Sequence, residues 1–471
     1  MFKFIKNIGL WGMALSCCLM SCGDDYPESR IESYATDLTS IKILNAGADG
    51  STVVEGVVDE EAKTINFPRL DVATNFSALQ VEATVSEGAK LEKEVYDFSM
   101  TDQDADKTLI LRVVNQKRYK DYFIKVRKNI PVYGADFEKG KVYNFSGETI
   151  YPDFTSLLTR GAAFDGQYVL IVTRAANKPH LLKVSDLMNG ETKPLPLDLT
   201  DVSGGTYPYN QGALANGHVY IATLSGSKFS PLKIYYWDTP TSKPEVIANI
   251  GISGIPGAGA RHGDNMSLSL DKNGNGYVFF GDNASTEILR LTVTDHKTVS
   301  DPVVLPSSPN ATAFMNINRV ENSSLFVWSG IRVPVTLTDE SVGVKYVLNP
   351  ENLPVEGIDP RIFYFNNERY LMVCTAGLGS STKATPAIYV YNITKGATVE
   401  EALKIFDEGE NHNPVYQCIL GGSGNAAPSA QTGYYVEKDE QGKDVKLYLF
   451  GARADSGFAI CEFPIKQQDE D

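Results

Sequence analysis

The densest group of chemically versatile side chains lies in the segment GIPGAGARHGDNMS, residues 254–267. Arg261, His262 and Asp264 place a fixed cation, a titratable ring and a carboxylate within four residues. The glycines of the segment allow positive φ angles and a close approach of the backbone to a ligand. Because loops carry function more often than the elements they connect, the segment predicts ligand contacts. In the alternative interpretation, Arg261 and Asp264 form a structural ion pair between blades and His262 occupies a turn.

The sequence contains no established catalytic motif: a Ser-His-Asp order, a nucleophile elbow, a phosphate loop and an HExxH helix are all absent. Two carboxylates, Asp264 and Asp359, could act as the acid and base of glycosidic cleavage, which needs two carboxyl groups about 5 to 10 Å apart. Spacing along the chain does not give their separation in space. Polysaccharide cleavage therefore stays an alternative, and the sequence leans toward binding without catalysis.

The segment DKNGNGYVFFGD resembles the start of a calcium-binding loop at Asp271, Asn273 and Asn275. Asp282 stands where a glutamate normally supplies two oxygens. The flanking SLSL and YVFF are typical of paired strands, and Asn-Gly pairs favour the hairpin turn between them, which would leave Asp282 far away. We therefore expect a hairpin, with calcium as the alternative. No other metal or cofactor is expected, because no Cys or His pair has zinc-ligand spacing.

The elements that would position these residues repeat along residues 131–471. Each copy has an inner strand, a Gly or Asn turn, a strongly apolar strand and a third strand, at intervals of about fifty residues apart from a longer last interval. The copies begin near Arg160, Gln211, Asn265, Phe314, Pro360 and Gln431. This predicts a β-propeller of six blades, with seven as the alternative, because stacked blades can bury faces that one blade cannot. Residues 141–147 are expected to supply a strand that closes the ring.

In a propeller, the loops that lead into the inner strands gather at one end of a central channel. Residues at equivalent places in different blades then become neighbours, and a wet ring of donors and acceptors can hold a polar ligand. Two tyrosines of a Gly/Pro-rich loop add aromatic faces that can stack on sugars. The predicted ligand-binding residues are Arg160, Tyr207, Tyr209, Gln211, Arg261, His262, Asp264, Asn265, Asn316 and Arg361, beside the loop of residues 421–431.

Three cysteines lie in the region of the repeats: Cys374, Cys418 and Cys461, each within an apolar, strand-like run. An odd number of thiols cannot be fully paired, so a disulfide framework is excluded. Cysteines in strands are typically buried, and we expect free buried thiols here.

The first 21 residues have the parts of an export signal: two lysines, an apolar stretch at residues 8–20 and a small residue before Cys22. The apolar stretch is shorter than the about 20 residues that span a membrane. Residues 19–22, LMSC, resemble the lipobox of bacterial lipoproteins. The resemblance implies lipidation of Cys22 and removal of residues 1–21, and an ordinary secretory signal with a chance cysteine is the alternative.

Residues 22–37 are expected to form an acylated tether. Asp24 and Asp25 resemble the export tag of surface lipoproteins in glycan-foraging Gram-negative bacteria. The tag implies an outer-membrane protein that faces the cell exterior, with the periplasmic face as the alternative. The formal net charge of −15 argues against nucleic acid or anionic lipid as a partner, so the lipid anchor provides the membrane contact.

Residues 38–128 show strands with period-two alternation, and a break with a proline follows. The order of a VEGVVDEEAKTI hairpin, an LQVEATVSEGA strand and a closing DYFIKV resembles the Ig-like domains that follow the anchor in many surface lipoproteins. It implies an Ig-like β-sandwich that serves as a spacer. The expected fold class is therefore all-β, with an N-terminal Ig-like sandwich and a C-terminal β-propeller.

The whole arrangement resembles bacterial surface lipoproteins with an Ig-like N-terminal domain and a propeller of the domain-of-unknown-function type. The resemblance implies a binding role in nutrient capture, with a carbohydrate as ligand and an outer-membrane transporter as a further partner. Two other classes remain open. A polysaccharide-degrading enzyme requires two close carboxylates at the channel mouth, and a protein–protein scaffold requires an exposed apolar patch on a propeller face.

Overall fold

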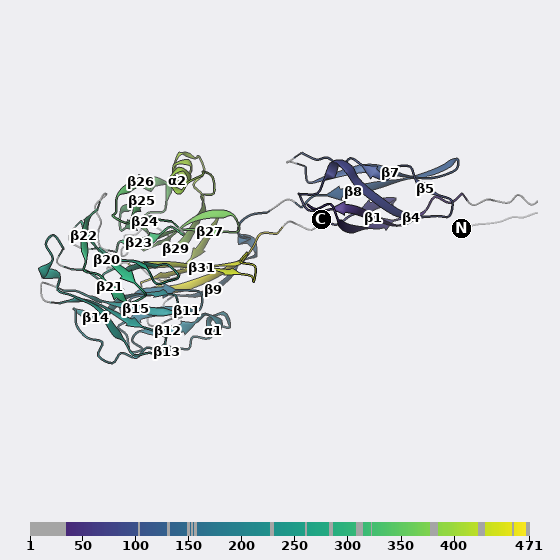
Figure 1. Ribbon diagram of the computed structural model, residues 1–471. Helices are drawn as coiled ribbons and strands as arrows, with labels where there is room; N and C mark the ends of the chain where they lie inside the picture. Colours follow the sequence, from purple (N-terminus) through teal and green to yellow (C-terminus); the bar gives the residue numbers. More distant parts are fainter. Residues whose placement is uncertain are drawn as a thin grey trace, which may run out of the picture. The chain divides into compact units, whose positions relative to one another are not determined.

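The computed structural model describes residues 34–467, without residues 102–103, 130–131, 148–150, 152–153, 155–157, 227–229, 260, 282–285, 308–313, 322, 377–384, 423–428 and 455. The chain divides into two compact units, Met1–Pro131 and Val132–Asp471 (Figure 1). Cys22 and the predicted signal lie outside the described residues, as does Asp282. A search of the described part of the chain finds no helix with the length and hydropathy to cross a membrane.

The first unit is an all-β structure around a hydrophobic core of its own. Its strands are hydrogen-bonded in the order β5-β7-β8-β3-β2-β1-β4-β6, and only the β3–β8 pair is parallel. Side chains alternate along β8, where Tyr122, Ile124 and Val126 are buried and Phe123 is exposed, so the predicted period of two is confirmed there. The strands are β1 (Leu38–Ala46), β2 (Thr52–Asp59), β3 (Thr64–Asn66), β4 (Leu79–Val85), β5 (Lys90–Leu91), β6 (Val95–Tyr96), β7 (Asp106–Asn115) and β8 (Arg118–Arg127).

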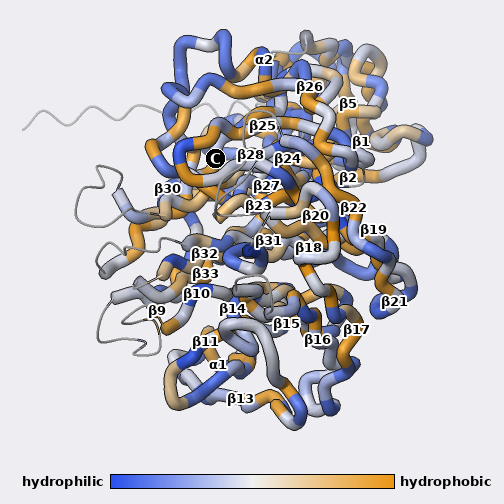
Figure 2. The backbone as a smooth tube through the Cα atoms, turned by 90° about the vertical axis from the view of Figure 1, so that its left-hand side faces the viewer, coloured by the Kyte–Doolittle hydropathy of each residue, from blue (hydrophilic) through white to orange (hydrophobic). Residues whose placement is uncertain are grey.

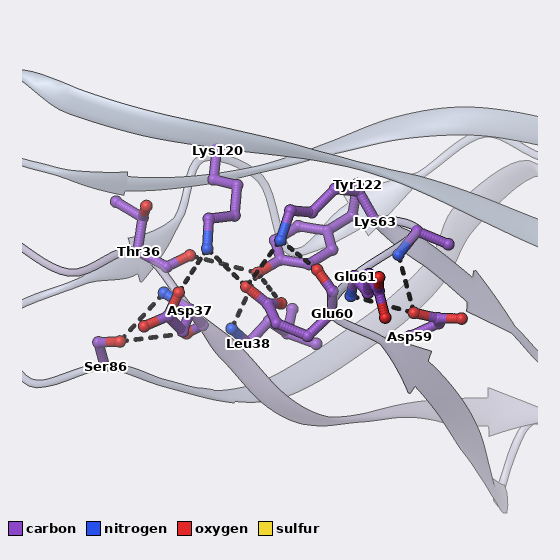
Figure 3. A network of polar contacts seen from close by, with 11 residues as sticks. Thr36, Asp37, Leu38, Asp59, Glu60, Glu61, Lys63, Ser86, Lys120 and Tyr122 are labelled. Carbon is purple, nitrogen blue, oxygen red and sulfur yellow. Dashed lines mark hydrogen bonds and ion pairs between the residues drawn. The ribbon is translucent and has the colours of Figure 1, made fainter.

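A polar network joins β8 to the turn between β2 and β3 (Figure 3). The Glu60 carboxylate accepts hydrogen bonds from Lys120 Nζ at 2.5 Å, Tyr122 Oη at 2.5 Å and Lys63 Nζ at 3.1 Å. Partial burial raises the pKa of Glu60, but these hydrogen bonds outweigh it and lower that pKa to about 2. Tyr122 Oη also accepts a hydrogen bond from the Leu38 N–H, which connects the network to β1.

The second unit is a β-propeller of six blades, so six is confirmed over seven. Each blade is an antiparallel sheet of four or five strands whose innermost strand comes first in the chain, except that β9 joins the last blade. Blade 1 contains β10 (Thr159–Phe164), β11 (Tyr168–Thr173), β12 (His180–Lys183) and β13 (Leu195–Pro196); blade 2 β14 (Tyr207–Ala215), β15 (His218–Leu224), β16 (Leu232–Trp237) and β17 (Glu245–Ile250); blade 3 β18 (Ser267–Leu270), β19 (Gly276–Gly281), β20 (Glu287–Thr294), β21 (Thr298–Val299) and β22 (Val303–Pro306). Blade 4 contains β23 (Asn316–Arg319), β24 (Leu325–Gly330), β25 (Val333–Asp339) and β26 (Val344–Val347); blade 5 β27 (Gly357–Phe365), β28 (Glu368–Thr375), β29 (Ala387–Asn392) and β30 (Tyr416–Ile419); blade 6 β31 (Ala430–Lys438), β32 (Asp444–Arg453), β33 (Gly457–Pro464) and β9 (Lys141–Ser146). Two short helices, α1 (Val184–Met188) and α2 (Val399–Glu408), follow β12 and β29.

Strand β9 closes the ring, as the sequence predicts. It pairs antiparallel with β33 over its whole length, and Phe145 lies opposite Phe458 with the ring centres 5.1 Å apart. The pairing covers the edge of β33, which would otherwise present unpaired backbone groups. The beginning and the end of the propeller sequence therefore share one sheet.

The inner strands β10, β14, β18, β23, β27 and β31 gather in the middle of the propeller, and β13, β17 and β26 lie toward its rim (Figure 2). The second strand of each blade packs against neighbouring blades on both faces. In β28, for example, every residue from Arg369 to Thr375 is buried. This explains why the second strands read as continuous apolar runs rather than as alternating ones.

The prediction of free buried thiols is confirmed for Cys374, Cys418 and Cys461, which lie on β28, β30 and β33. Burial raises the pKa of the Cys374 thiol to about 12. A thiol of this kind packs as a small apolar side chain and is a poor nucleophile at neutral pH.

Candidate functional site

The inner strands run through the channel in the same sense. Ser267 Oγ accepts a hydrogen bond from the Ile317 N–H at 2.8 Å, and two residues further along, Ser269 Oγ accepts one from the Arg319 N–H at 3.2 Å. The channel therefore has a leading mouth, where the inner strands begin, and a trailing mouth, where they end. The sequence placed the ligand-binding residues at the leading mouth.

Several predicted residues do meet at the leading mouth. The Gln211 amide donates hydrogen bonds to the Arg160 carbonyl at 2.7 Å and to the Asp264 carbonyl at 2.9 Å. From blade 6, Ser429 Oγ and Gln431 Nε2 donate to the same Arg160 carbonyl at 2.9 and 3.2 Å. These bonds join blades 1, 2 and 6 and the loop before blade 3. Because both donors of the Gln211 amide are used in these bonds, its role is to hold the blades together.

An arginine pair shares the Asp264 carboxylate. Asp264 Oδ1 lies 3.0 Å from Arg261 Nη2 and 3.4 Å from Arg160 Nη2. Asp264 is 3% exposed and Arg160 is 8% exposed, whereas the Arg261 side chain is 39% exposed. An ion pair of Arg261 with Asp264 is therefore present, but within one loop rather than between blades, and Arg160 of blade 1 contacts the same oxygen.

His262 and Asn265 hold this loop in place through hydrogen bonds. His262 is fully buried, its Nδ1 lies 3.0 Å from the Gly281 carbonyl, and its N–H donates to Ser225 Oγ at 2.7 Å. Asn265 Oδ1 accepts a hydrogen bond from the Gly281 N–H at 3.1 Å. Both side chains thus attach the loop to Gly281 at the end of β19, and the His262 backbone attaches it to Ser225, just after β15; the partly exposed Arg261 lies on this supported loop.

Asp359 and Arg361 belong to a second polar cluster, between blades 4, 5 and 6. Asp359 Oδ1 accepts a hydrogen bond from Asn318 Nδ2 at 2.6 Å, and Asp359 Oδ2 accepts one from Thr432 Oγ1 at 3.0 Å. Arg361 Nε donates to Thr432 Oγ1 at 2.9 Å. Asp264 and Asp359, which the sequence offered as an acid–base pair, therefore sit in different clusters and share no hydrogen-bond partner among those observed.

The remaining predicted residues of the leading mouth differ in exposure. Tyr207 is 40% exposed at the start of β14, and the Arg174 guanidinium carbon lies 4.0 Å from its ring centre, a cation–π contact. Tyr209 packs, partly buried, against the core between blades 1 and 2. Asn316 is buried at the start of β23, where it pairs with Ser329. Of these three, Tyr207 presents its ring to solvent.

The predicted hairpin between β18 and β19 is confirmed. Asp271 Oδ1 accepts hydrogen bonds from the N–H groups of Asn273 at 2.8 Å and Asn275 at 2.9 Å. Asn275 Oδ1 accepts one from the Asp295 N–H at 3.1 Å. The side chains of Asp271 and Asn275, two of the three residues proposed as calcium ligands, thus close the turn. In the described ranges, no group of three or more His, Cys, Asp or Glu side chains could hold a metal ion.

The trailing mouth holds a cavity of about 860 Å³. All six blades contribute to its wall: Asp165 (blade 1), Asn216 (blade 2), Asp271 (blade 3), Arg319 and Glu321 (blade 4), Arg361 (blade 5) and Tyr434 (blade 6). The wall combines donors and acceptors with the aromatic side chains of Phe164 and Tyr434. Burial raises the pKa of the Asp165 carboxyl, although its oxygen accepts hydrogen bonds from two backbone N–H groups.

Neighbouring groups hold several of these side chains in place. The Tyr434 ring stacks on Phe363 with centres 4.7 Å apart, and its hydroxyl donates to Glu321 at 3.5 Å. Arg361 is fixed through Thr432, as described above. The Arg319 guanidinium carbon lies 5.5 Å from the centre of the Phe326 ring, and in the described part of the chain its Nε has no hydrogen-bond partner. Arg319 thus lines the cavity with a cation, and its buried Nε keeps an unsatisfied donor.

Comparison with known proteins assigns the family. The model described as "Domain of unknown function (DUF4623)" matches residues 24–466. The chain belongs to the DUF4623 family. Its sequence is 60% identical to a DUF4623 family protein from Bacteroides eggerthii DSM 20697 of known crystal structure, with 93% of this chain and 100% of that chain covered and a TM-score of 0.79.

More distant structures resemble this DUF4623 protein only weakly. A subtype N10 neuraminidase-like protein of A/little yellow-shouldered bat/Guatemala/060/2010 is 9% identical, over 66% of this chain and 95% of that chain, with a TM-score of 0.37. A GH43 endo-arabinanase from Bacillus licheniformis is 13% identical, over 53% and 91% of the two chains, with a TM-score of 0.31. A search of curated proteins gives no match. At these TM-scores, neither structure informs the function of the DUF4623 protein.

Sequence reasoning missed most of the trailing-mouth cavity. It named Arg361 for the leading mouth and Asp271 for calcium, but not Asp165, Arg319 or Glu321. One signal was present: each missed residue lies at the end of an inner strand, in or just before the turn to the next strand. In a propeller these turns gather around the channel just as the leading loops do.

Proposed function

We propose that this DUF4623 protein is a lipid-anchored surface lipoprotein whose propeller binds a carbohydrate as part of a nutrient-capture system. The observation that carries the proposal is the trailing-mouth cavity. Its volume of about 860 Å³ falls within the about 300–1,000 Å³ of small-molecule sites. All six blades contribute residues to its wall, so a ligand bound there can contact residues of every blade.

The chemistry of the cavity wall suits a hydroxyl-rich ligand. Each sugar hydroxyl can both donate and accept a hydrogen bond. Arg319 and Arg361 supply donors, and Asp165 and Glu321 supply acceptors, on the same wall as Tyr434. Phe363 and Thr432 hold Tyr434 and Arg361 in place, which lowers the entropic cost of binding.

The architecture before the propeller supports a surface location. We propose that the first unit is the Ig-like spacer that its sequence resembles, and that Cys22 is the lipidated residue. A unit with its own core can carry the propeller away from a membrane without contributing to its fold. The acidic residues after Cys22 favour the cell exterior over the periplasmic face. Nutrient capture also requires a partner, and we propose a transporter in the same membrane.

Affinity electrophoresis tests carbohydrate binding. The soluble form, residue 29 onward, is run in native gels cast with a panel of polysaccharides, and we expect one glycan to retard it. Unchanged mobility across the panel would refute simple polysaccharide binding and would direct attention to a protein partner.

Two matched variants test the position of the site. Arg319→Gln removes a cation that lines the cavity, and Arg332→Gln removes an exposed cation of the same blade. We expect Arg319→Gln to weaken binding of the retarding glycan at least tenfold and Arg332→Gln to leave it unchanged. Equal affinities for both variants would place the glycan outside the trailing-mouth cavity.

Metabolic labelling tests the anchor. We expect the wild-type chain, expressed in a Gram-negative host, to incorporate labelled palmitate and Cys22→Ala to lose the label. Protease treatment of intact cells then distinguishes the two faces of the outer membrane, because only an outward-facing chain is degraded. Label that persists in Cys22→Ala would contradict lipidation at this cysteine.

A further inference from the structure

We propose that the leading mouth is a second ligand site, which binds an oxyanion through Arg160 and Arg261. The oxyanion is either a free inorganic anion or the acidic group of a sugar such as a uronic acid. This site is separate from the cavity at the trailing mouth, so the proposal does not depend on carbohydrate binding there.

The first observation concerns Arg160. This guanidinium is buried, and its ion-pair contact with Asp264 Oδ1 is long, at 3.4 Å. Its Nε is a buried donor without a hydrogen-bond partner in the part of the chain that the structure describes. Buried polar groups are nearly always hydrogen-bonded, and an unsatisfied donor on a charged group is especially unfavourable. A bound acceptor would satisfy it.

The second observation is the gathering of like charges around Arg160. Arg261 contacts the same oxygen of Asp264, at 3.0 Å, so two guanidinium groups share one carboxylate oxygen. Burial lowers the pKa of Arg160, and the positive charges of Arg174 and Arg261 lower it further, against the opposing effect of Asp264. An anion placed between these groups would offset the desolvation of the Arg160 guanidinium. It would also offset the repulsion between Arg160 and the charges of Arg174 and Arg261.

The third observation is the shape that the neighbours provide. Arg174 lies over the ring of Tyr207, whose exposed part could contact the apolar face of a sugar. The side chain of Gln211 holds the backbone of Arg160 and Asp264 at fixed positions. Arg160 is therefore presented from a rigid base, and guanidinium groups bind planar oxyanions with two parallel hydrogen bonds.

Isothermal titration calorimetry of the soluble chain, residue 29 onward, tests the proposal with glucuronate, glucose and sodium sulfate as probes. We expect glucuronate to bind, glucose not to compete with it, and added sodium chloride to weaken the interaction. Binding of sulfate without glucuronate would support the oxyanion site and assign it to a free inorganic anion. The absence of binding for both anions at millimolar concentration would overturn the proposal.

The variants separate a binding role from a folding role. Arg261→Gln alters a partly exposed side chain, so we expect a folded protein with at least tenfold weaker glucuronate binding. Arg160→Gln should reduce binding further, and its melting temperature shows whether it folds. Arg332→Gln, an exposed arginine of blade 4, is the matched control. Wild-type affinity in Arg261→Gln would refute the assignment, whatever the result for Arg160.

Discussion

Asp359→Ala is expected to destabilise the propeller by about 4 kcal/mol. Asp359 is 3% exposed and accepts hydrogen bonds from Asn318 of blade 4 and from the N–H and hydroxyl of Thr432 of blade 6. Each buried donor left unsatisfied costs about 1–3 kcal/mol, and the losses within one network are not additive. The removal of one partner of a buried charged network typically costs about 3–5 kcal/mol, which sets the estimate.

This loss corresponds to a measurable change in melting temperature. An unfolding entropy of about 2.1 cal/mol/K per residue, over the roughly 340 residues of Val132–Asp471, gives about 0.7 kcal/mol/K. A loss of about 4 kcal/mol therefore lowers Tm by about 6 °C. Tryptophan fluorescence reports on this unit, because Trp237 and Trp328 lie in the propeller and the third tryptophan is Trp11, in the predicted signal.

Two comparisons make the Asp359 experiment decisive. Asp359→Asn retains one acceptor oxygen and tolerates the positive φ of 52° at this position, so it should lose less stability than Asp359→Ala. Asp301→Ala removes an exposed carboxylate of blade 3 and should leave Tm within about 1 °C. A fall of less than about 2 °C for Asp359→Ala would refute the conclusion that this carboxylate joins the blades.

Two further predictions follow from packing and from charge. In Gly451→Ala the new Cβ would lie 2.4 Å from Ile388 Cγ1, so we expect a loss of about 1–3 kcal/mol in the same melting assay. Gly254→Ala, whose Cβ meets no heavy atom within 4 Å, is the control, and equal Tm values would contradict tight packing between blades 5 and 6. The pKa of Glu60 is about 2 in the folded chain, below its ordinary value of 4.5, so its stabilising contribution is present above pH 4.5 and is lost as the pH falls toward 2. Because the Glu60 side chain is 41% exposed, solvent screening limits this contribution to about 1 kcal/mol. Hydrogen exchange of β8 should show the acid-induced loss in the wild type and a weaker one in Glu60→Gln, and identical profiles would disprove the role of Glu60.

The architecture of the propeller could be predicted from sequence because its determinants are local and repeated. Each second strand is largely buried on both faces, and its apolar run recurs once in every blade. The closing strand was predictable for a related reason: residues 141–146 form a short strand-like segment that lies outside the six repeats. It therefore had to pair with the one blade that the C-terminal repeat left incomplete.

The roles of the channel residues could not be predicted in the same way. Three inner strands, β10, β14 and β27, carry a register shift near their first residues. A register shift changes the direction of the side chains beyond it, and the sequence contains no clear sign of where it occurs. Gln211 and Arg361 follow such shifts, and hydrogen bonds to neighbouring blades engage both of them.

The pattern of hydrogen bonds gives a physical criterion for ligand-binding groups in this channel. The inner strands of neighbouring blades are not paired in a continuous sheet, so polar side chains such as Gln211 and Asp359 bridge them. A polar residue on an inner strand can therefore be explained by its hydrogen bonds between blades, without any contact to a ligand. Among the arginines of the inner strands, Arg160 and Arg319 each keep a donor that none of the described residues satisfies, whereas Arg361 Nε donates to Thr432. They lie at opposite ends of the channel, and a ligand that supplied an acceptor there would gain from satisfying these donors.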